Sequence, residues 1–93
     1  MAKLMGNLRV TAIPASGGTR PHFEVMFVPY AGRFNTKPAI AGTYDDLVSL
    51  LMELKFNEDE STRWAGKARA QGLILIDSFE RTEALLKEKG LLA

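Results

Sequence analysis

The sequence predicts an α+β domain in which a small three-stranded sheet packs against three helices. Apolar residues alternate through residues 7–30, as in a β-hairpin, and recur with helical spacing between residues 43 and 71. A short continuous apolar run at 73–76 then predicts a buried strand. The predicted order is therefore ββααβα, and 93 residues are enough for one domain, residues 1–93, with an ordinary core.

The N-terminal hairpin has a predictable register. When Leu8 is placed opposite Phe27, one face of the two strands is wholly apolar and the other is mixed. A shift of one residue would destroy this separation, so the register is well specified. The connection over residues 14–21 begins and ends with proline and contains two glycines, which is typical of a turn.

Two helices follow the long connection over residues 29–42. Thr43 is the expected N-cap of the first, and the second begins at Asn57, where Glu60 completes a capping box. The second helix is expected to end near Gln71, with Gly72 in the left-handed conformation that closes a helix. The apolar stripe of the first helix consists of Leu47, Leu50, Leu51 and Leu54.

The C-terminal part predicts a strand and a third helix. The strand covers residues 73–76, and Asp77 or Ser78 is the expected cap of a helix over 79–89. Gly90 is expected to close this helix in a Schellman motif. If the two preceding helices are antiparallel to each other, the strand runs in the direction of the first strand.

A single buried cluster is expected, with Trp64 at its edge. Its predicted members are Leu8, Val10, Phe23, Val25, Phe27, Leu47, Leu50, Leu51, Leu54, Leu75 and Leu86.

Composition excludes several kinds of chemistry. The chain has no cysteine, so disulfides, thiol catalysis and thiolate metal sites are impossible. Its N-terminal residues do not have the pattern of a signal peptide, and no apolar run is long enough to span a bilayer. We therefore expect a cytoplasmic protein without contact to a membrane.

Charge is distributed unevenly along the chain. Residues 1–42 contain five basic residues and one acidic residue, whereas residues 43–93 contain seven basic and ten acidic residues. Most of the acidic residues fall in predicted first turns of helices, where they complement the helix macrodipole. No carboxylate pair stands apart from these positions, so no general acid–base pair is predicted.

The single histidine offers the only starting point for catalysis. His22 and Glu24 are two residues apart on one face of a strand, so a histidine–carboxylate pair is possible. No second histidine or cysteine completes a metal site, and the glycine-rich segment lacks the P-loop spacing. We expect no metal and no cofactor. A small-molecule enzyme built around His22 and Glu24 is the third of three functional hypotheses.

The long connection over residues 29–42 carries the leading hypothesis. Aromatic and basic side chains gather there without a helix to explain the charges, and such side chains are enriched at interfaces. We expect a non-catalytic binding or regulatory module that contacts a protein through this loop and the adjoining sheet face. The alternative is a nucleic-acid-binding protein, although a helix-turn-helix is disfavoured because acidic residues begin the second helix. The predicted binding residues are Tyr30, Arg33, Phe34, Lys37, Arg9 and Arg20.

Two further expectations concern exposure and assembly. Arg33 and Lys37 should lie in solvent on a mobile or partly exposed loop, unless Phe34 and Ile40 enter the core and the loop is only a connector. The second face of the hairpin mixes polar residues with apolar ones such as Met26. Unless the helices cover both faces of the sheet, an apolar patch remains exposed, and we then expect a homodimer or a waiting partner surface.

Overall fold

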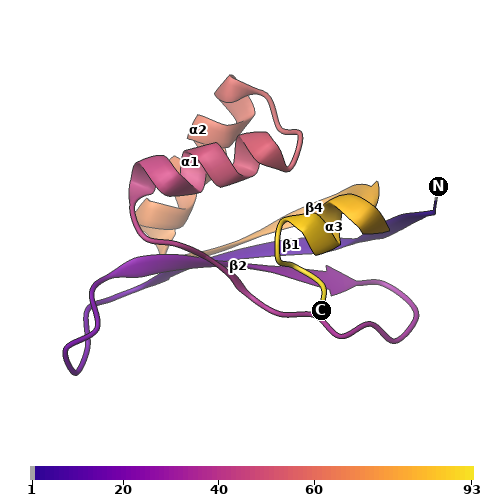
Figure 1. Ribbon diagram of the computed structural model, residues 1–93. Helices are drawn as coiled ribbons and strands as arrows, with labels where there is room; N and C mark the ends of the chain where they lie inside the picture. Colours follow the sequence, from indigo (N-terminus) through magenta and orange to yellow (C-terminus); the bar gives the residue numbers. More distant parts are fainter. Residues whose placement is uncertain (1) are drawn as a thin grey trace.

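The structure, a computed structural model, describes residues 2–93. Four strands form one antiparallel sheet in the order β3-β2-β1-β4, and all three helices lie on the same side of it (Figure 1). The elements are β1 (Lys3–Ile13), β2 (His22–Pro29), β3 (Ala39–Ala41), α1 (Tyr44–Glu53), α2 (Glu58–Gln71), β4 (Leu73–Thr82) and α3 (Glu83–Glu88).

The α+β class is confirmed, but the sheet has four strands instead of three. The additional strand, β3, lies within the connection that showed no period in the sequence, and it pairs Ala41 with Phe23 of β2. It is only three residues long and lies between Pro38 and Gly42, so no alternation could reveal it. The edge of β2 stabilises it through tertiary contact rather than through local preference.

The hairpin register is confirmed. Leu8 lies opposite Phe27, and the pairing continues without interruption to Ile13 opposite His22. The apolar face of this hairpin packs under the helices, as Leu8 and Phe27 are both completely buried.

The predicted helix caps of α1 and α2 are also confirmed. The Thr43 hydroxyl accepts a hydrogen bond of 3.0 Å from the backbone N–H of Asp46. Asn57 and Glu60 form a complete capping box at the start of α2. Gly72 closes α2 with φ = 87°, a conformation that a residue with a Cβ rarely adopts.

The predicted start of the third helix is wrong. Strand β4 continues to Thr82, whose hydroxyl caps α3, and neither Asp77 nor Ser78 begins a helix. A β-bulge opposite the segment between Gly6 and Leu8 places Ser78 at φ = 56°. Because β1 begins at Lys3, it offers additional residues for pairing, and the bulge returns the next apolar side chain to the covered face.

The C-terminal end of α3 follows the prediction. Gly90 has φ = 80°, and its N–H donates to the carbonyl of Lys87 at 3.2 Å. The N–H of Leu91 donates to the carbonyl of Leu86 at 2.9 Å, which completes a Schellman motif.

The direction of β4 differs from the expectation. β4 lies beside β1 and runs antiparallel to it. The expectation counted only two strands before the helices, whereas β3 reverses the chain once more. The strand that follows the helices therefore enters the sheet in the opposite direction.

The predicted core is correct apart from one residue, and three others lie at its margin. Leu75 is 53% exposed, whereas its neighbours Ile74 and Ile76 are buried. A continuous apolar strand gives no alternation, so the sequence could not decide which of its residues face the helices. Phe23, Leu50 and Trp64 are partly buried and pack against the core. Eight predicted residues are buried: Leu8, Val10, Val25, Phe27, Leu47, Leu51, Leu54 and Leu86.

Arg81 joins β4 to the end of α1. Its Nε donates a hydrogen bond to the carbonyl of Leu54, the residue at the C-cap of α1. Its guanidinium lies 4.5 Å from the ring centre of Phe79 and 5.0 Å from that of Phe56. Burial lowers the pKa of Arg81 from its usual value, and the charge of Glu60 opposes that shift. A cation here complements the C-terminal end of the helix.

We therefore expect Arg81→Met to lower the free energy of unfolding by about 1–2 kcal/mol, because a charged hydrogen bond and two cation–π contacts are lost. Arg81→Lys should recover only part of this loss, since lysine keeps the charge but not the planar guanidinium. Urea denaturation measures both variants. If Arg81→Met and the unchanged protein were equally stable, the contacts of Arg81 would make no net contribution to the free energy of unfolding.

Candidate functional site

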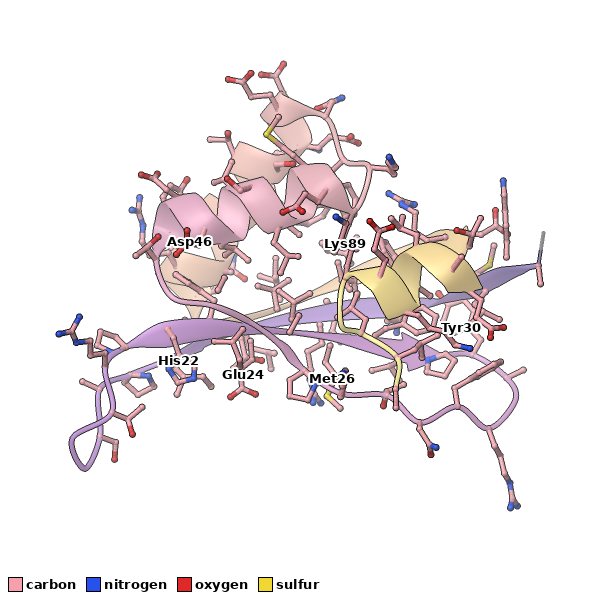
Figure 2. The ribbon with its side chains drawn as sticks, in the orientation of Figure 1. His22, Glu24, Met26, Tyr30, Asp46 and Lys89 are labelled. Carbon is pink, nitrogen blue, oxygen red and sulfur yellow. The ribbon has the colours of Figure 1, made fainter. Side chains whose placement is uncertain are left out.

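One face of the sheet has no cover. Because α1, α2 and α3 all pack on the same side, the side chains that point the other way remain open to solvent (Figure 1). Figure 2 shows His22, Glu24 and Met26 on this side, below the sheet and away from the helices. We call this surface the open face. It consists of Met5, Asn7, Arg9, Thr11, Ile13, His22, Glu24, Met26, Val28, Tyr30, Ile40, Leu73, Leu75 and Glu80.

The open face is rich in aliphatic side chains. Ile40 is 59% exposed, and Leu73 and Leu75 are each about half exposed. Leu73 lies opposite Thr11 on β1, and Leu75 lies opposite Arg9, so the apolar residues of β4 border the polar centre of the face. The most exposed aliphatic side chains thus lie on both edge strands, β3 and β4, and a partner laid across the whole face would bury both groups.

Two opposite charges lie on the inner strands of the open face. Arg9 on β1 is paired in register with Met26, and its guanidinium donates to the sulfur of Met26 at 3.2 Å. Within residues 2–93, no carboxylate oxygen lies within salt-bridge distance of Arg9. Among residues 2–93, the ring of His22 is the only basic group within salt-bridge distance of Glu24, at 3.6 Å, and this contact is an ion pair only when the histidine is protonated.

Tyr30 belongs to the open face rather than to the loop. Its hydroxyl donates to Asn7 Oδ1 at 2.9 Å and accepts from the backbone N–H of Ser78 at 3.0 Å. Its own N–H donates to the carbonyl of Met5, which continues the β1–β2 ladder by one pair. The ring is thus held in place across β1 and reaches the bulge of β4.

The other predicted binding residues are dispersed. Arg33 is exposed in the loop after β2, whereas Arg20 lies in the β1–β2 turn at the opposite end of the sheet. Phe34 packs partly against the core, and Lys37 lines a groove beside β3. Of the six, only Arg9 and Tyr30 lie on the open face, and they are four residues apart along it, since Arg9 is opposite Met26.

The loop itself is tied at its second half to the C-terminus. The carbonyl of Asn35 accepts from the N–H of Ala93, and the N–H of Lys37 donates to the carbonyl of Leu91. Arg33 and Lys37 are exposed as expected, while the mobility of the loop remains a prediction. Of the two residues that the connector hypothesis placed in the core, Phe34 packs partly against it, whereas Ile40 does not enter it.

A groove of about 530 Å³ lies beside β3, at the edge of the sheet. Asp46 and Glu53 of α1 line one side, and Lys37 and Lys89 contribute positive charge (Figure 2). Lys89 Nζ lies 2.8 Å from Glu53 Oε1, and this hydrogen bond raises the pKa of Lys89 above its usual value. The two basic and two acidic side chains of its lining carry no net charge together, and Lys89 with Glu53 forms an ion pair among them.

A second groove of the same volume lies where β1 and β2 meet the turn that joins them. Its lining is mostly apolar, with Pro14, Pro21 and Phe23, and Arg69 and His22 reach its rim. Arg69 lies 4.1 Å from the ring centre of Tyr44, so its charge is already in contact with an aromatic face. The groove could receive an apolar side chain but holds no reactive group besides the histidine.

The His22–Glu24 pair forms, but the groups that contact the histidine ring come only from neighbouring residues in the chain. Nδ1 of His22 lies 3.0 Å from the carbonyl oxygen of Arg20, and Nε2 faces Glu24. Both ring nitrogens thus have a partner from the same strand or its turn. Within residues 2–93, no three side chains of the types that bind metals lie close enough to share an ion, and no helix is long and apolar enough to cross a membrane.

No protein-family model, curated protein or solved structure matches this chain. The class of the protein therefore follows from the fold and the open face alone: an α+β domain with one helical layer and one uncovered sheet face.

Most of the binding residues predicted from the sequence lie in the loop over residues 29–42, and none lies on β4. Leu73, Leu75 and Ile40 are the most exposed aliphatic residues of the open face, and none was among the predicted binding residues. A signal did exist, because a continuous apolar strand must place side chains on both faces of a sheet. The burial of Ile74 and Ile76 shows which of them the helices cover.

Proposed function

We propose that the protein is a non-catalytic binding or regulatory module that contacts another protein molecule through the open face. The observation that carries this proposal is the exposure of Ile40, Leu73 and Leu75 on a sheet face that no helix covers. A partner that buries these side chains gains the hydrophobic free energy that the isolated domain leaves unused.

The composition of the open face favours a protein over a nucleic acid. Single-stranded nucleic acids bind to faces that combine several stacking aromatics with a basic groove. Here Tyr30 is the only exposed aromatic of the face. The positive charge of Arg9 is offset by the negative charge of Glu24 on the adjacent strand. Of the remaining basic residues of the nucleic-acid hypothesis, Arg20 and Arg33 belong to segments at opposite ends of the sheet, and Lys37 lines the groove beside β3.

Binding is also better supported than catalysis. A catalytic site needs groups that converge on one reacting atom, usually in a concave pocket. The open face is a broad sheet surface, and His22 with Glu24 is its only candidate pair. Aliphatic side chains dominate the rest, and these serve contact rather than chemistry.

Photo-crosslinking tests the proposal. A benzophenone amino acid replaces Ile40 or Leu75 on the open face, and Met52, which is exposed on α1, serves as the matched control position. On irradiation in the native cells, we expect adducts that contain a second polypeptide at both open-face positions and none at Met52. Introducing Leu73→Glu should remove these adducts, because a buried carboxylate without a partner is costly.

Two results would contradict the proposal. One is the absence of any adduct specific to the open face. The other is an adduct whose added mass is removed by nuclease, which leaves a species of the size of the single chain, since it would favour the nucleic-acid alternative. Titration with oligonucleotides at low salt then checks that alternative, because phosphate contacts weaken as salt rises.

A further inference from the structure

We infer that the occupant of the open face is a second copy of this chain, in a two-fold dimer in which Arg9 of each protomer pairs with Glu24 of the other. The inference rests on the proposed function and names its partner. Its basis is the charge pattern of the open face together with the size of that face.

The charge pattern is self-complementary. Arg9 and Glu24 lie on adjacent strands, one register position apart, since Arg9 is opposite Met26 and Glu24 is opposite Thr11. Arg9 donates to a sulfur atom, and among residues 2–93 no carboxylate oxygen, including that of Glu24 on the adjacent strand, lies within salt-bridge distance of it. A two-fold axis always creates contacts in reciprocal pairs. One arginine and one glutamate on each copy therefore give two identical salt bridges and leave neither charge unpaired.

Burial of the open face requires such a partner for Arg9. An apolar partner would cover a guanidinium that forms no ion pair among residues 2–93 of its own chain, which costs several times what a hydrogen bond returns. In such a dimer, Leu75 opposite Arg9 and Ile40 opposite Glu24 exclude water from the pair. Two copies packed face to face would resemble the two aligned sheets of a β-sandwich.

The size of the open face agrees with a dimer. The four strands contain 11, 8, 3 and 10 residues. At about 4.8 Å between strands and about 3.3 Å per residue, they cover roughly 500 Å² in flat projection. Side-chain relief makes the accessible area larger, so full overlap approaches the roughly 800 Å² per partner of a standard interface. Little of the face can remain uncovered in such a dimer, and a dissociation constant near the micromolar range is expected.

Charge exchange tests the dimer. By sedimentation velocity at concentrations well above this dissociation constant, the unchanged protein should be a dimer. Arg9→Glu and Glu24→Arg should each weaken self-association at least about tenfold, because each variant places like charges opposite one another twice. An equimolar mixture of the two should form a 1:1 heterodimer, and the double variant should recover the homodimer. Arg63→Glu, on exposed α2, carries the same change of charge and should leave the dimer intact.

Each outcome separates this inference from the proposed function. Circular dichroism confirms that the variants are folded. A dimer that ignores both single substitutions would overturn the inference, because it would form through a sheet edge or the helices instead. A monomeric protein whose Ile40 and Leu75 positions crosslink to a different polypeptide would also overturn the inference while leaving the proposed function in place. A monomer without adducts at the open face would overturn both.

Discussion

Phe27→Ala is expected to lower the free energy of unfolding by about 3–5 kcal/mol, which is a large share of the stability of a small domain. Phe27 is completely buried on β2, and its ring lies 6.0 Å from that of Phe79 on β4. Phe79 in turn lies 5.7 Å from Phe56, between α1 and α2. Removing the first ring leaves a cavity in the layer that joins the sheet to the helices.

The adjacent residue provides the matched control. Val28 follows Phe27 on the same strand but points to the open face, where it is 41% exposed. Val28→Ala should change stability by no more than about 0.5 kcal/mol when the protein is monomeric. Urea or thermal denaturation at low concentration measures both variants. If the two substitutions had similar effects, the assignment of the covered and open faces would be wrong.

Gly6→Ala is expected to have the second largest effect and to destabilise the domain by about 2–3 kcal/mol or more. A Cβ at Gly6 would lie 2.2 Å from the carbonyl oxygen of Val28 and 2.8 Å from Cα of Pro29. Both neighbours are backbone atoms of the paired strand, so neither can rotate away. The substitution therefore has to separate β1 from β2 close to the point where the β4 bulge begins.

The same substitution in helix α2 should have the opposite sign. A Cβ at Gly66 would meet only the hydroxyl of Tyr44, at 3.8 Å, which is an ordinary contact. Alanine also loses less backbone entropy than glycine when a helix forms. Gly66→Ala should therefore stabilise the domain by about 0.5–1 kcal/mol. Equal losses at Gly6 and Gly66 would show that the packing around one of them differs from this structure.

Stability variants can also test whether the open face is a binding surface. Substitutions on the covered face, such as Phe27→Ala, should weaken binding only through unfolding. Leu75→Glu should leave the fold intact, because Leu75 is half exposed in the isolated domain. Comparison of the two classes therefore distinguishes a contact surface from a part of the core.

The local features of this fold were predictable because each depends on neighbours in the chain. Thr43 and Asn57 cap helices through hydrogen bonds that span three residues. The pairing of Leu8 with Phe27 follows from one apolar face on each of two strands joined by a short turn. Gly72 and Gly90 close helices because they adopt the left-handed conformation without strain.

The tertiary structure alone decided the features that depend on distant neighbours. Strand β3 exists because the edge of β2 was free, and residues 77–82 form a strand because the start of β1 was free to pair with them. The apolar run of β4 could place either set of alternate residues under the helices. Its register with β1 places Leu75 in solvent and Ile76 against the helices. The open face also depends on distant neighbours. The amphipathic pattern of a helix shows that it must cover an apolar surface, but only the path of the chain shows that α1, α2 and α3 all cover the same face of the sheet.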